Sequence, residues 1–329
     1  MIKVAINGFG RIGRLFFRQA KEAGDIQVVA INDLGDLDNL SYLLKYDSVY
    51  GKFEKGLKGV EIFKEKDPAK LPWKKLKIDI VVEATGVFDS YEKAKVHIKA
   101  GAKRVVITAP AKDSDGENGR TILSGVNEKD MGACSITSNG SCTTNAASPV
   151  IKILSFNPGI QKAVLNTTHG YTATQSLVDG PSRGKDVRRG RAAAQNIIPS
   201  TTGAAATVTR AIPQLEGKFD GIALRVPVVA GSIADITFIS KKKTSVKEIN
   251  SILSKAAESA QWKGILKVTE DPVVSSDILK EPYSAIVDLN FTRVVDGDLV
   301  KVLSWYDNEW GYVTTLIRHV MISAKALTK

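Results

Sequence analysis

The sequence predicts an α/β fold in which an N-terminal doubly wound parallel sheet precedes an α+β domain with a mostly antiparallel sheet. Through the first 140 residues, short apolar runs alternate with segments that carry apolar residues at helical spacing, as in doubly wound sheets. After residue 141 the predicted strands are longer and alternate polar with apolar residues, as expected for a sheet with one covered face. We therefore expect domains at 1–141 and 142–308, with a last helix within 309–329 that packs back on the first domain.

Each element is predicted from its local pattern. The first domain is expected to contain strands at 2–6, 26–31, 60–63, 77–83, 104–108 and 121–126 and helices at 14–23, 39–46 and 91–100. The second domain is expected to contain strands at 162–168, 221–228, 232–240, 284–291 and 299–306 and helices at 146–154, 202–212, 246–260 and 309–326.

The first predicted strand runs into a glycine-rich turn that indicates a Rossmann dinucleotide-binding unit. Residues 8–13 read Gly8-Phe9-Gly10-Arg11-Ile12-Gly13 and lead into a helix. Such glycines allow a tight turn, a close approach to a pyrophosphate and close packing of helix on strand. Asp33 ends the next strand, 20 residues after Gly13, where an acid binds a ribose hydroxyl and repels a 2′-phosphate, so NAD is favoured over NADP. The alternative is that the glycines serve only a tight turn.

Two more strand ends in this domain are candidate neighbours of a dinucleotide. Thr85-Gly86 and Thr108 each follow a predicted buried strand. Ligands of doubly wound sheets bind beyond the carboxyl ends of the strands. Either position could equally be a plain strand end.

The composition indicates a cytoplasmic protein without a membrane segment. No run approaches the roughly 18 to 20 apolar residues of a membrane span, and the N-terminus lacks the pattern of a signal peptide. Two cysteines in 329 residues do not make a disulfide framework. The net charge of +11 is compatible with nucleic acid, an anionic membrane surface or anionic small molecules. The lysines are spread over segments such as 52–77 and 241–247, which favours a solvated basic surface.

One of the two cysteines lies in the segment Ser141-Cys142-Thr143-Thr144-Asn145, directly before an apolar helical run. At a helix N-terminus, unpaired backbone N–H groups and the helix dipole stabilise a thiolate, so the sequence predicts a lowered pKa and a nucleophile. The alternative is a small buried apolar side chain, which is the commoner role of a lone cysteine.

The three histidines have different settings. His97 lies in a predicted helix among lysines and is expected to be exposed, and His319 lies in the last helix and is expected to be structural. His169 ends a predicted strand and opens a long loop, where catalytic side chains are commonly placed. An imidazole within hydrogen-bonding reach activates a cysteine nucleophile, so His169 with Cys142 makes a testable pair. The alternative is a histidine that merely caps a strand.

Three features after His169 suggest anion binding. The loop 172–195 carries the basic residues Arg183, Lys185, Arg188, Arg189 and Arg191. These could bind nucleic acid or a phosphorylated ligand, or form ion pairs at a subunit interface, but clustered arginine without aromatic residues is weak support for nucleic acid. The run Ser200-Thr201-Thr202-Gly203 precedes a helix and is a natural small-anion site. Arg225 lies inside an apolar strand and needs an anionic partner, which a substrate phosphate could supply.

Several segments, spread over nearly the whole chain, match one known enzyme family in order. They are Asn7-Gly8-Phe9-Gly10-Arg11-Ile12-Gly13-Arg14, Ile31-Asn32-Asp33-Leu34, Ser141-Cys142-Thr143-Thr144-Asn145, His169-Gly170-Tyr171-Thr172, Arg188-Arg189-Gly190-Arg191-Ala192-Ala193, Thr202-Gly203-Ala204-Ala205, Leu224-Arg225-Val226-Pro227 and Trp305-Tyr306-Asp307-Asn308-Glu309-Trp310-Gly311-Tyr312. In these segments the chain resembles phosphorylating glyceraldehyde-3-phosphate dehydrogenase. The resemblance implies oxidation of glyceraldehyde 3-phosphate by NAD and inorganic phosphate, to give 1,3-bisphosphoglycerate through a cysteine thioester.

The resemblance also implies roles for individual residues. Cys142 would be the nucleophile and His169 its base. Ligands of the substrate's own phosphate would be Thr172 and Arg225, and those of the attacking phosphate Ser141, Thr143, Thr202 and Gly203. The cofactor would be bound by Asn7, Gly8, Phe9, Gly10, Arg11, Ile12, Asp33, Lys66 (where the family commonly has arginine), Thr85, Gly86, Thr108, Asn308 and Tyr312. The resemblance further implies a homotetramer, and no metal is expected.

Two other functions stay open from the sequence. An erythrose-4-phosphate dehydrogenase shares this scaffold and cysteine chemistry, but its oxidation ends in hydrolysis, and Thr202-Gly203 favours attack by phosphate. A basic protein of this fold that binds nucleic acid is the alternative from another class. Nucleic acid is not expected as the main partner, because every residue that the chemistry needs is present.

Overall fold

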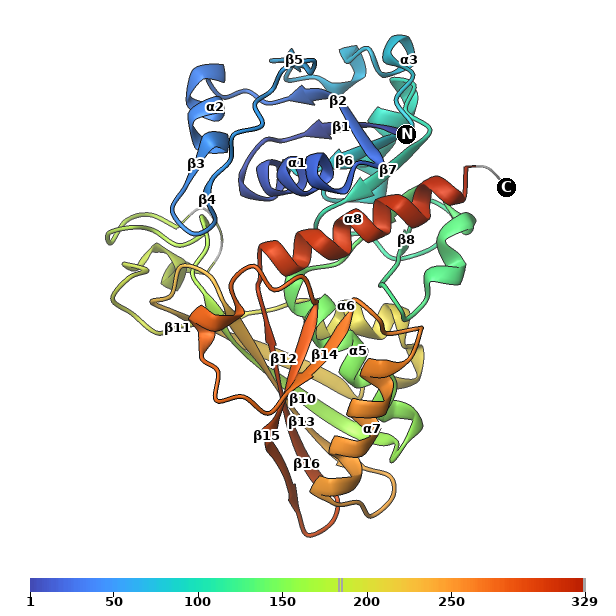
Figure 1. Ribbon diagram of the computed structural model, residues 1–329, viewed down its shortest axis with the longest axis vertical. Helices are drawn as coiled ribbons and strands as arrows, with labels where there is room; N and C mark the ends of the chain where they lie inside the picture. Colours follow the sequence, from blue (N-terminus) through green and yellow to red (C-terminus); the bar gives the residue numbers. More distant parts are fainter. Residues whose placement is uncertain (183, 185, 328–329) are drawn as a thin grey trace. The chain divides into compact units, whose positions relative to one another are not determined.

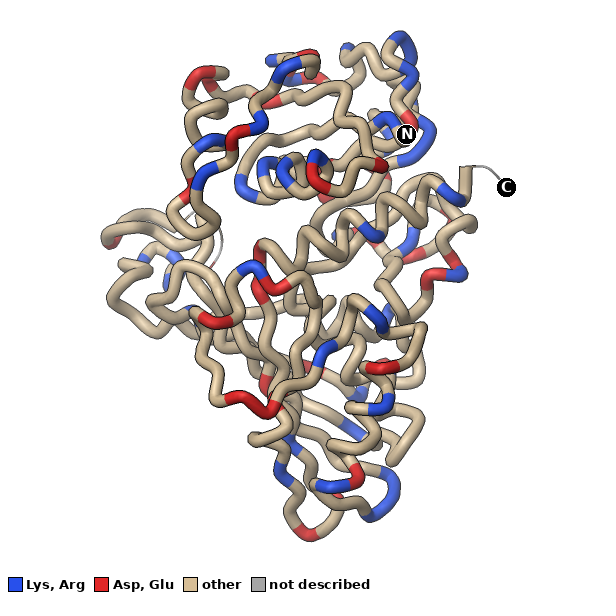
Figure 2. The backbone as a smooth tube through the Cα atoms, in the orientation of Figure 1, with Lys and Arg blue, Asp and Glu red and all other residues tan. Residues whose placement is uncertain are grey.

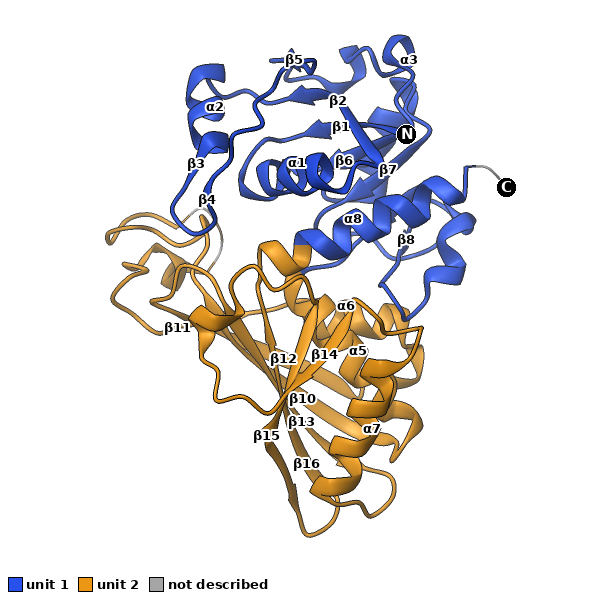
Figure 3. Ribbon diagram, in the orientation of Figure 1, with its two compact units in different colours: residues 1–141, 313–329 blue, residues 142–312 orange. Residues whose placement is uncertain are grey.

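The computed structural model describes residues 1–182, 184 and 186–327, and the chain divides into two compact units (Figures 1 and 3). The first unit comprises Met1–Ser141 with Val313–Lys329, and the second comprises Cys142–Tyr312. Each unit contains its own seven-stranded sheet. Within the described ranges, no helix is both long and apolar enough to cross a membrane.

The sheet of the first unit has the order β5-β2-β1-β6-β7-β9-β8, and its neighbouring strands all pair in parallel. The strands are β1 (Ile2–Asn7), β2 (Ile26–Asn32), β5 (Glu61–Phe63), β6 (Ile80–Glu83), β7 (Arg104–Ile107), β8 (Arg120–Thr121) and β9 (Ile136–Ser138), with a separate hairpin of β3 (Tyr46–Asp47) and β4 (Gly51–Lys52). The helices are α1 (Arg11–Ala23), α2 (Leu37–Lys45), α3 (Trp73–Leu76) and α4 (Tyr91–Lys99). The parallel, doubly wound fold that the sequence predicts is confirmed.

The turn between β1 and α1 needs its glycines because backbone passes very close to it. Gly8 has φ +95°, and a Cβ there would lie 2.6 Å from the carbonyl carbon of Ala84 and from the backbone nitrogen of Thr85. A Cβ on Gly13 would lie 2.2 Å from the carbonyl oxygen of Gly8. Any larger residue would therefore separate the turn from the end of β6 or the helix from its strand.

The described part of helix α8 (Trp310–Lys325) from Val313 onward is held in the first unit by buried polar contacts. The buried guanidinium of Arg104 donates to the Ser323 hydroxyl over 2.7 Å. His319 Nε2 lies 2.7 Å from the Thr137 hydroxyl, and its Nδ1 lies 3.1 Å from Asn139 Oδ1. Burial, followed by the positive charge of Arg104, lowers the pKa of His319 to about 3, so the ring is neutral. His319 is thus buried in a hydrogen-bonded network between a helix and a strand.

The sheet of the second unit has the order β11-β12-β10-β13-β16-β15-β14. Its strands are β10 (Ile160–Gly170), β11 (Ile198–Thr201), β12 (Phe219–Val226), β13 (Ser232–Ser240), β14 (Leu266–Thr269), β15 (Ala285–Val295) and β16 (Leu299–Tyr306). The pairs β10–β12 and β14–β15 are parallel and the other neighbours are antiparallel, so the predicted, mostly antiparallel sheet is confirmed. Helices α5 (Cys142–Phe156), α6 (Ala204–Ala211) and α7 (Val246–Glu258) pack on one face of it (Figure 1).

Two predictions about local structure are wrong, and several short strands were missed. Residues 122–126 do not continue a strand: β8 is only Arg120–Thr121, although Ile122 and Leu123 are buried. The short strands β3, β4, β9, β11 and β14 were not predicted. His97 is not exposed but completely buried, because Tyr91, Ala94 and His97 follow at three-residue spacing and form the inner face of α4.

Candidate active site

The thiol of Cys142 and the imidazole of His169 lie in contact within the second unit. Helix α5 begins at Cys142, and His169 is the penultimate residue of β10, on which α5 packs. The distance from Cys142 Sγ to His169 Nε2 is 3.3 Å. Cys142 is half-buried and His169 is 3% exposed. The pair predicted from the sequence is therefore brought together with the imidazole in position to exchange a proton with the thiol.

Arg225 lies beside this histidine because β10 and β12 pair in parallel with His169 opposite Arg225. Its Nη1 is 2.6 Å from His169 Nδ1 and 3.2 Å from the carbonyl oxygen of Gly170. The same carbonyl oxygen lies 2.6 Å from His169 Nδ1. A guanidinium can only donate, so Nδ1 accepts while Arg225 is bound to it, and it can donate to Gly170 only after Arg225 moves away.

The pKa values of the pair differ from the simplest expectation. Burial raises the pKa of the Cys142 thiol, and the positive charge of Arg225 and the backbone N–H of Thr143 oppose this only in part. The predicted lowered pKa is therefore wrong, because a helix N-terminus stabilises an anion by only about 0.3–1 kcal/mol, less than the cost of burying it. Burial and then Arg225 lower the pKa of His169 to about 3. Near pH 7 the site therefore holds a neutral thiol next to a neutral imidazole.

Tyr306 contacts His169 and the residue after Cys142, and it was not singled out from the sequence. Its buried hydroxyl lies 2.8 Å from the Thr143 hydroxyl and 2.7 Å from the Thr167 hydroxyl. Its ring meets the His169 ring edge-on, with centroids 5.9 Å apart. Burial raises its pKa, so the phenol stays protonated. The only signal in the sequence was its place within the segment 305–312, which contributed to the resemblance.

The start of the loop after β10 gathers hydroxyl groups around an arginine. Thr172 donates its backbone N–H to the side-chain oxygen of Gln175 over 2.8 Å, and its hydroxyl lies 2.9 Å from that of Thr174. Arg189 donates to the Thr174 hydroxyl over 3.3 Å and to the carbonyl oxygen of Thr201 over 3.5 Å. Burial lowers the pKa of Arg225 most, and the positive charge of Arg189 adds to this. The guanidinium groups of Arg189 and Arg225, together with these hydroxyls, are therefore suited to bind a phosphate.

The segment before α6 has the form expected of a small-anion site. Gly203 is the N-cap of α6 without a capping side chain, and the Thr202 hydroxyl accepts from the backbone N–H of Ala204 over 3.2 Å. Of the predicted phosphate ligands near the thiol, Thr143 is buried on α5, and Ser141 is half-buried directly before that helix.

Most of the predicted cofactor residues lie at the carboxyl edge of the first unit's sheet. Asp33 accepts the backbone N–H of Phe9 over 2.6 Å and that of Gly35 over 2.7 Å, so it fixes the glycine turn. Gly10 is the N-cap of α1 without a capping side chain, and a Cβ on it would meet no atom within 4 Å. This open helix start, with no acid in its first turn, fits the pyrophosphate of a dinucleotide.

The other predicted cofactor residues have varied settings. In the first unit, Thr85 and Gly86 are exposed just beyond β6. Thr108 donates its hydroxyl to the carbonyl oxygen of Glu83 over 3.0 Å. Arg11 forms an ion pair of 3.0 Å with Asp47. Ile12 is half-buried, and Lys66 is exposed on the chain after β5. Asn308 and Tyr312 belong to the second unit. There Asn308 Oδ1 accepts from the backbone N–H of Gly231 over 3.1 Å and from the Ser232 hydroxyl over 2.9 Å, which fixes its amide.

Part of the predicted basic loop lies outside the described residues, namely Arg183 and Lys185. Arg188 donates to Asp186 over 2.8 Å, and Arg191 donates to Asp179 over 2.9 Å. Much of the described charge of the loop is therefore balanced within it. Figure 2 also shows acidic residues interspersed with the basic ones in both units. Across the described chain, no three histidine, cysteine or acidic residues group as metal ligands.

The doubly wound unit with its glycine turn, together with the contact between a thiol and an imidazole, indicates a class of protein, the dinucleotide-dependent dehydrogenases. Comparison with known proteins places it within that class. Residues 2–91 match the model of the NAD binding domain of glyceraldehyde 3-phosphate dehydrogenase, and residues 141–308 match that of its C-terminal domain.

Similar proteins from other organisms are glyceraldehyde-3-phosphate dehydrogenases. The glyceraldehyde-3-phosphate dehydrogenase of Mycobacterium tuberculosis is 47% identical over 345 residues, which cover 99% of both chains. Glyceraldehyde-3-phosphate dehydrogenase 2 of Streptomyces avermitilis is 46% identical over 96% of both chains, and the Clostridium acetobutylicum enzyme is 45% identical over 99%. The chain belongs to the glyceraldehyde-3-phosphate dehydrogenase family. It is an oxidoreductase with that activity, and NAD is its cofactor.

Proposed function

We propose that Cys142 is the nucleophile of this reaction and His169 its general base. His169 Nε2 accepts the thiol proton as Sγ bonds to the aldehyde carbon of glyceraldehyde 3-phosphate, and returns it to the new alkoxide to give a hemithioacetal. Bound NAD supplies the hydride acceptor, and His169 takes the hydroxyl proton during the oxidation, which leaves a thioester on Cys142. Inorganic phosphate then displaces Sγ, which takes the proton back from His169, and 1,3-bisphosphoglycerate is released. The observation that carries this proposal is the 3.3 Å contact between Sγ and Nε2.

Arg225 is assigned a double role, as ligand of the substrate phosphate and as control of the histidine tautomer. His169 can accept a proton at Nε2 only when its Nδ1 carries the hydrogen, and the Gly170 carbonyl oxygen, 2.6 Å from Nδ1, can receive that hydrogen. While Arg225 donates to Nδ1, this arrangement is blocked. A substrate phosphate that draws the guanidinium away therefore favours the base form of His169.

We expect Arg225→Leu to raise the KM for glyceraldehyde 3-phosphate by about 10- to 100-fold, because a hydrogen bond to a charged group contributes roughly 1.5–3 kcal/mol. Steady-state NADH formation measures this effect. Glyceraldehyde without a phosphate is the matched control, since its KM should change less than threefold. An equal rise in KM for both aldehydes would contradict the assignment of Arg225 to the phosphate.

Two measurements distinguish the proposed function from that of an erythrose-4-phosphate dehydrogenase. They are the preferred substrate and the dependence on inorganic phosphate. The site before α6, with Thr202 and the open helix start at Gly203, supports attack by phosphate. We expect kcat/KM to be higher for glyceraldehyde 3-phosphate than for erythrose 4-phosphate, and sustained turnover to require inorganic phosphate. Preferential oxidation of erythrose 4-phosphate without phosphate would favour the alternative.

The preference for NAD is assigned to Asp33. Its half-buried carboxylate would lie near a 2′-phosphate and repel it. We expect Asp33→Gly to raise the ratio of kcat/KM for NADP over NAD by about tenfold or more, or ~1.4 kcal/mol. Asp36→Asn is the control, because Asp36 is exposed and asparagine keeps its cap on α2. An unchanged ratio in Asp33→Gly would refute this role.

The outer face of the second unit's sheet supports a homo-oligomer, with the homotetramer implied by the resemblance as the proposed state. On the face opposite α5, α6 and α7, Val164 and Ile222 are 59% and 54% exposed. Leu299 is 39% exposed on β16, two strands from β10. Exposed apolar side chains gathered on one sheet face are typical of a protein interface.

We expect Ile222→Lys to lower the mass of the assembly in solution, measured by size-exclusion chromatography with light scattering. The wild type should have about four times the 35.5 kDa of one chain. Phe156→Lys is the control, since Phe156 is also exposed but ends α5 on the helical layer. Dissociation in Phe156→Lys but not in Ile222→Lys would place the interface elsewhere.

The remaining proposals concern partners and location. The paired arginines of the loop give little support to nucleic acid as the main partner. The cytoplasm is the proposed location, in agreement with the free thiols of Cys134 and Cys142.

A further inference from the structure

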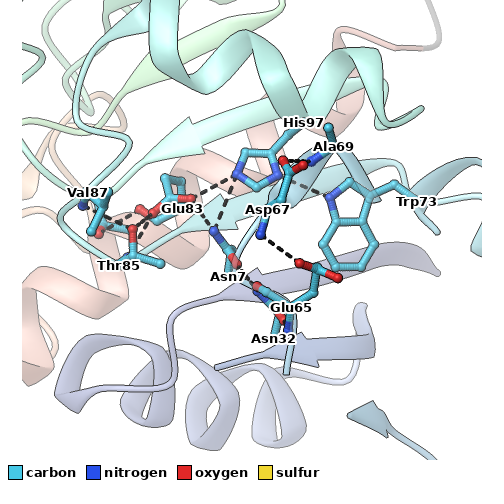
Figure 4. Close-up of polar contacts among 11 residues, drawn as sticks. Asn7, Asn32, Glu65, Asp67, Ala69, Trp73, Glu83, Thr85, Val87 and His97 are labelled. Carbon is cyan, nitrogen blue, oxygen red and sulfur yellow. Dashed lines mark hydrogen bonds and ion pairs between the residues drawn. The ribbon is translucent and has the colours of Figure 1, made fainter. Parts of the chain in front are cut away.

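A buried carboxylate with several donors lies under the carboxyl edge of the first unit's sheet (Figure 4). Glu83, the last residue of β6, is 2% exposed. Its Oε2 accepts from Asn7 Nδ2 over 2.6 Å and lies 2.9 Å from His97 Nε2. Its Oε1 accepts from the backbone N–H of Thr85 over 2.8 Å and from the Thr85 hydroxyl. Each of the two carboxylate oxygens of Glu83 therefore lies within hydrogen-bonding distance of two groups.

The hydrogen on His97 is fixed by Trp73. The indole Nε1 of Trp73 lies 3.1 Å from His97 Nδ1, and an indole N–H can only donate. Nδ1 must therefore accept, so the hydrogen of the neutral ring is on Nε2 and points at Glu83. Donors and acceptors match along the whole path from Trp73 through His97 to Glu83.

The network continues across the ends of three adjacent strands. Asn7, Asn32 and Glu83 end β1, β2 and β6, and the pairing places Asn7 opposite each of the other two. Asn32 Nδ2 donates to Asn7 Oδ1 over 2.7 Å, and Asn32 Oδ1 accepts the backbone N–H of Glu65 over 2.8 Å. Buried polar side chains that are hydrogen-bonded to one another in this way hold each other in one arrangement.

We propose that Glu83 and His97 are positioning residues for NAD, which hold the ends of β1 and β6 in the arrangement that the dinucleotide needs. The inference rests on the proposed assignment of Asn7 and Thr85 to the cofactor site. Neither Glu83 nor His97 is placed in contact with NAD or with the reacting thiol; they act through the residues that they hold.

The path from Glu83 to the cofactor site is short. Glu83 holds Thr85, whose hydroxyl accepts the backbone N–H of Val87 over 3.0 Å, so the turn after β6 is fixed. The same turn meets the glycine turn, because a Cβ on Gly8 would lie 2.6 Å from Thr85 N. A shift of Thr85 would therefore displace the loop assigned to the pyrophosphate.

The variant Glu83→Gln tests the positioning role of Glu83, because the glutamine side chain has nearly the same size and shape as that of glutamate. The glutamine oxygen can still accept from Thr85, but its NH2 group then faces the donors of Asn7 and His97. We expect the Kd and the KM for NAD to rise roughly tenfold, because a buried donor is left without an acceptor. The kcat at saturating NAD and the rate of Cys142 alkylation by iodoacetamide should stay within twofold of the wild type. A general loss of structure would change all four quantities.

Tyr91→Phe is the matched control. It removes a half-buried hydrogen bond of 2.7 Å to Asp115 from the same helix α4 that carries His97. We expect its NAD affinity to match the wild type. Trp73→Phe, which removes the far donor but keeps a ring in the core, is the second test variant and should weaken NAD binding about threefold.

The outcomes separate the two proposals. NAD affinity within twofold of the wild type in folded Glu83→Gln and Trp73→Phe would overturn the positioning role alone. An equal loss in Tyr91→Phe would also overturn it, by showing a general effect of destabilisation. A wild-type chain that does not bind NAD, measured by calorimetry, would overturn both this role and the cofactor site on which it rests.

Discussion

Replacing Cys142 with alanine should reduce NADH formation from glyceraldehyde 3-phosphate to the background rate. The thiol is the only group assigned to bond with the aldehyde carbon, and without that bond no thioester can form. In nucleophilic catalysis the covalent route replaces one difficult step with two easier ones, so its loss removes the route as a whole. A loss of at least about 10⁴-fold in kcat/KM is therefore expected, the size seen when a nucleophile is removed.

The other cysteine provides the control. Cys134 is buried in the first unit, where its Sγ lies 3.2 Å from the carbonyl oxygen of Gly116. Cys134→Ser should keep kcat/KM within about twofold, and both variants should show the circular dichroism spectrum of the wild type. Full activity in Cys142→Ala would show that the proposed chemistry is wrong.

Replacing His169 with asparagine should lower kcat by about 10² to 10⁴, the usual contribution of a general base. In the proposed mechanism His169, which is buried and in contact with Cys142, accepts the proton of the thiol and that of the hemithioacetal hydroxyl. Its pKa of about 3 keeps the ring unprotonated at pH 7, and base function is lost only as the pH falls towards 3. In kcat/KM, which reports the free enzyme with Arg225 beside His169, the wild type should therefore show no loss with a midpoint near pH 6.5.

A variant of His319 tests whether the fall in kcat is specific to the histidine next to Cys142. His319→Asn also removes a buried imidazole, but one that contacts Thr137 and Asn139 in the first unit. We expect a lower melting temperature and a kcat within about twofold of the wild type. Equal losses of kcat in the two histidine variants would contradict the role of His169.

The parts of the molecule that the sequence predicts well are those with a fixed local pattern. The strand, glycine turn and helix at the N-terminus follow from spacing alone, since close backbone contacts require Gly8 and Gly13. Cys142 was predicted at a helix start because an apolar helical run follows it directly. The strands β13 and β16 were predicted to the residue, because one-sided burial produces a clear alternation.

The parts that were missed depend on contacts between distant segments. His97 stands among lysines in the sequence, and its partners Trp73 and Glu83 lie on other elements of the fold. Tyr306 reaches Thr143 and Thr167 from a strand more than a hundred residues away. The raised pKa of Cys142 could not be predicted either, because the helix start is a local property and burial is a property of the fold.

The most direct test of the account is a rapid-mixing measurement of NADH without inorganic phosphate. If Cys142 carries the oxidised substrate as a thioester, mixing the enzyme with NAD and glyceraldehyde 3-phosphate should give a burst of one NADH per chain and then little further turnover. Intact mass spectrometry should find the acyl group on Cys142, and added phosphate should remove it and restore steady turnover. Steady NADH formation without phosphate, with no burst and no adduct, would contradict the account.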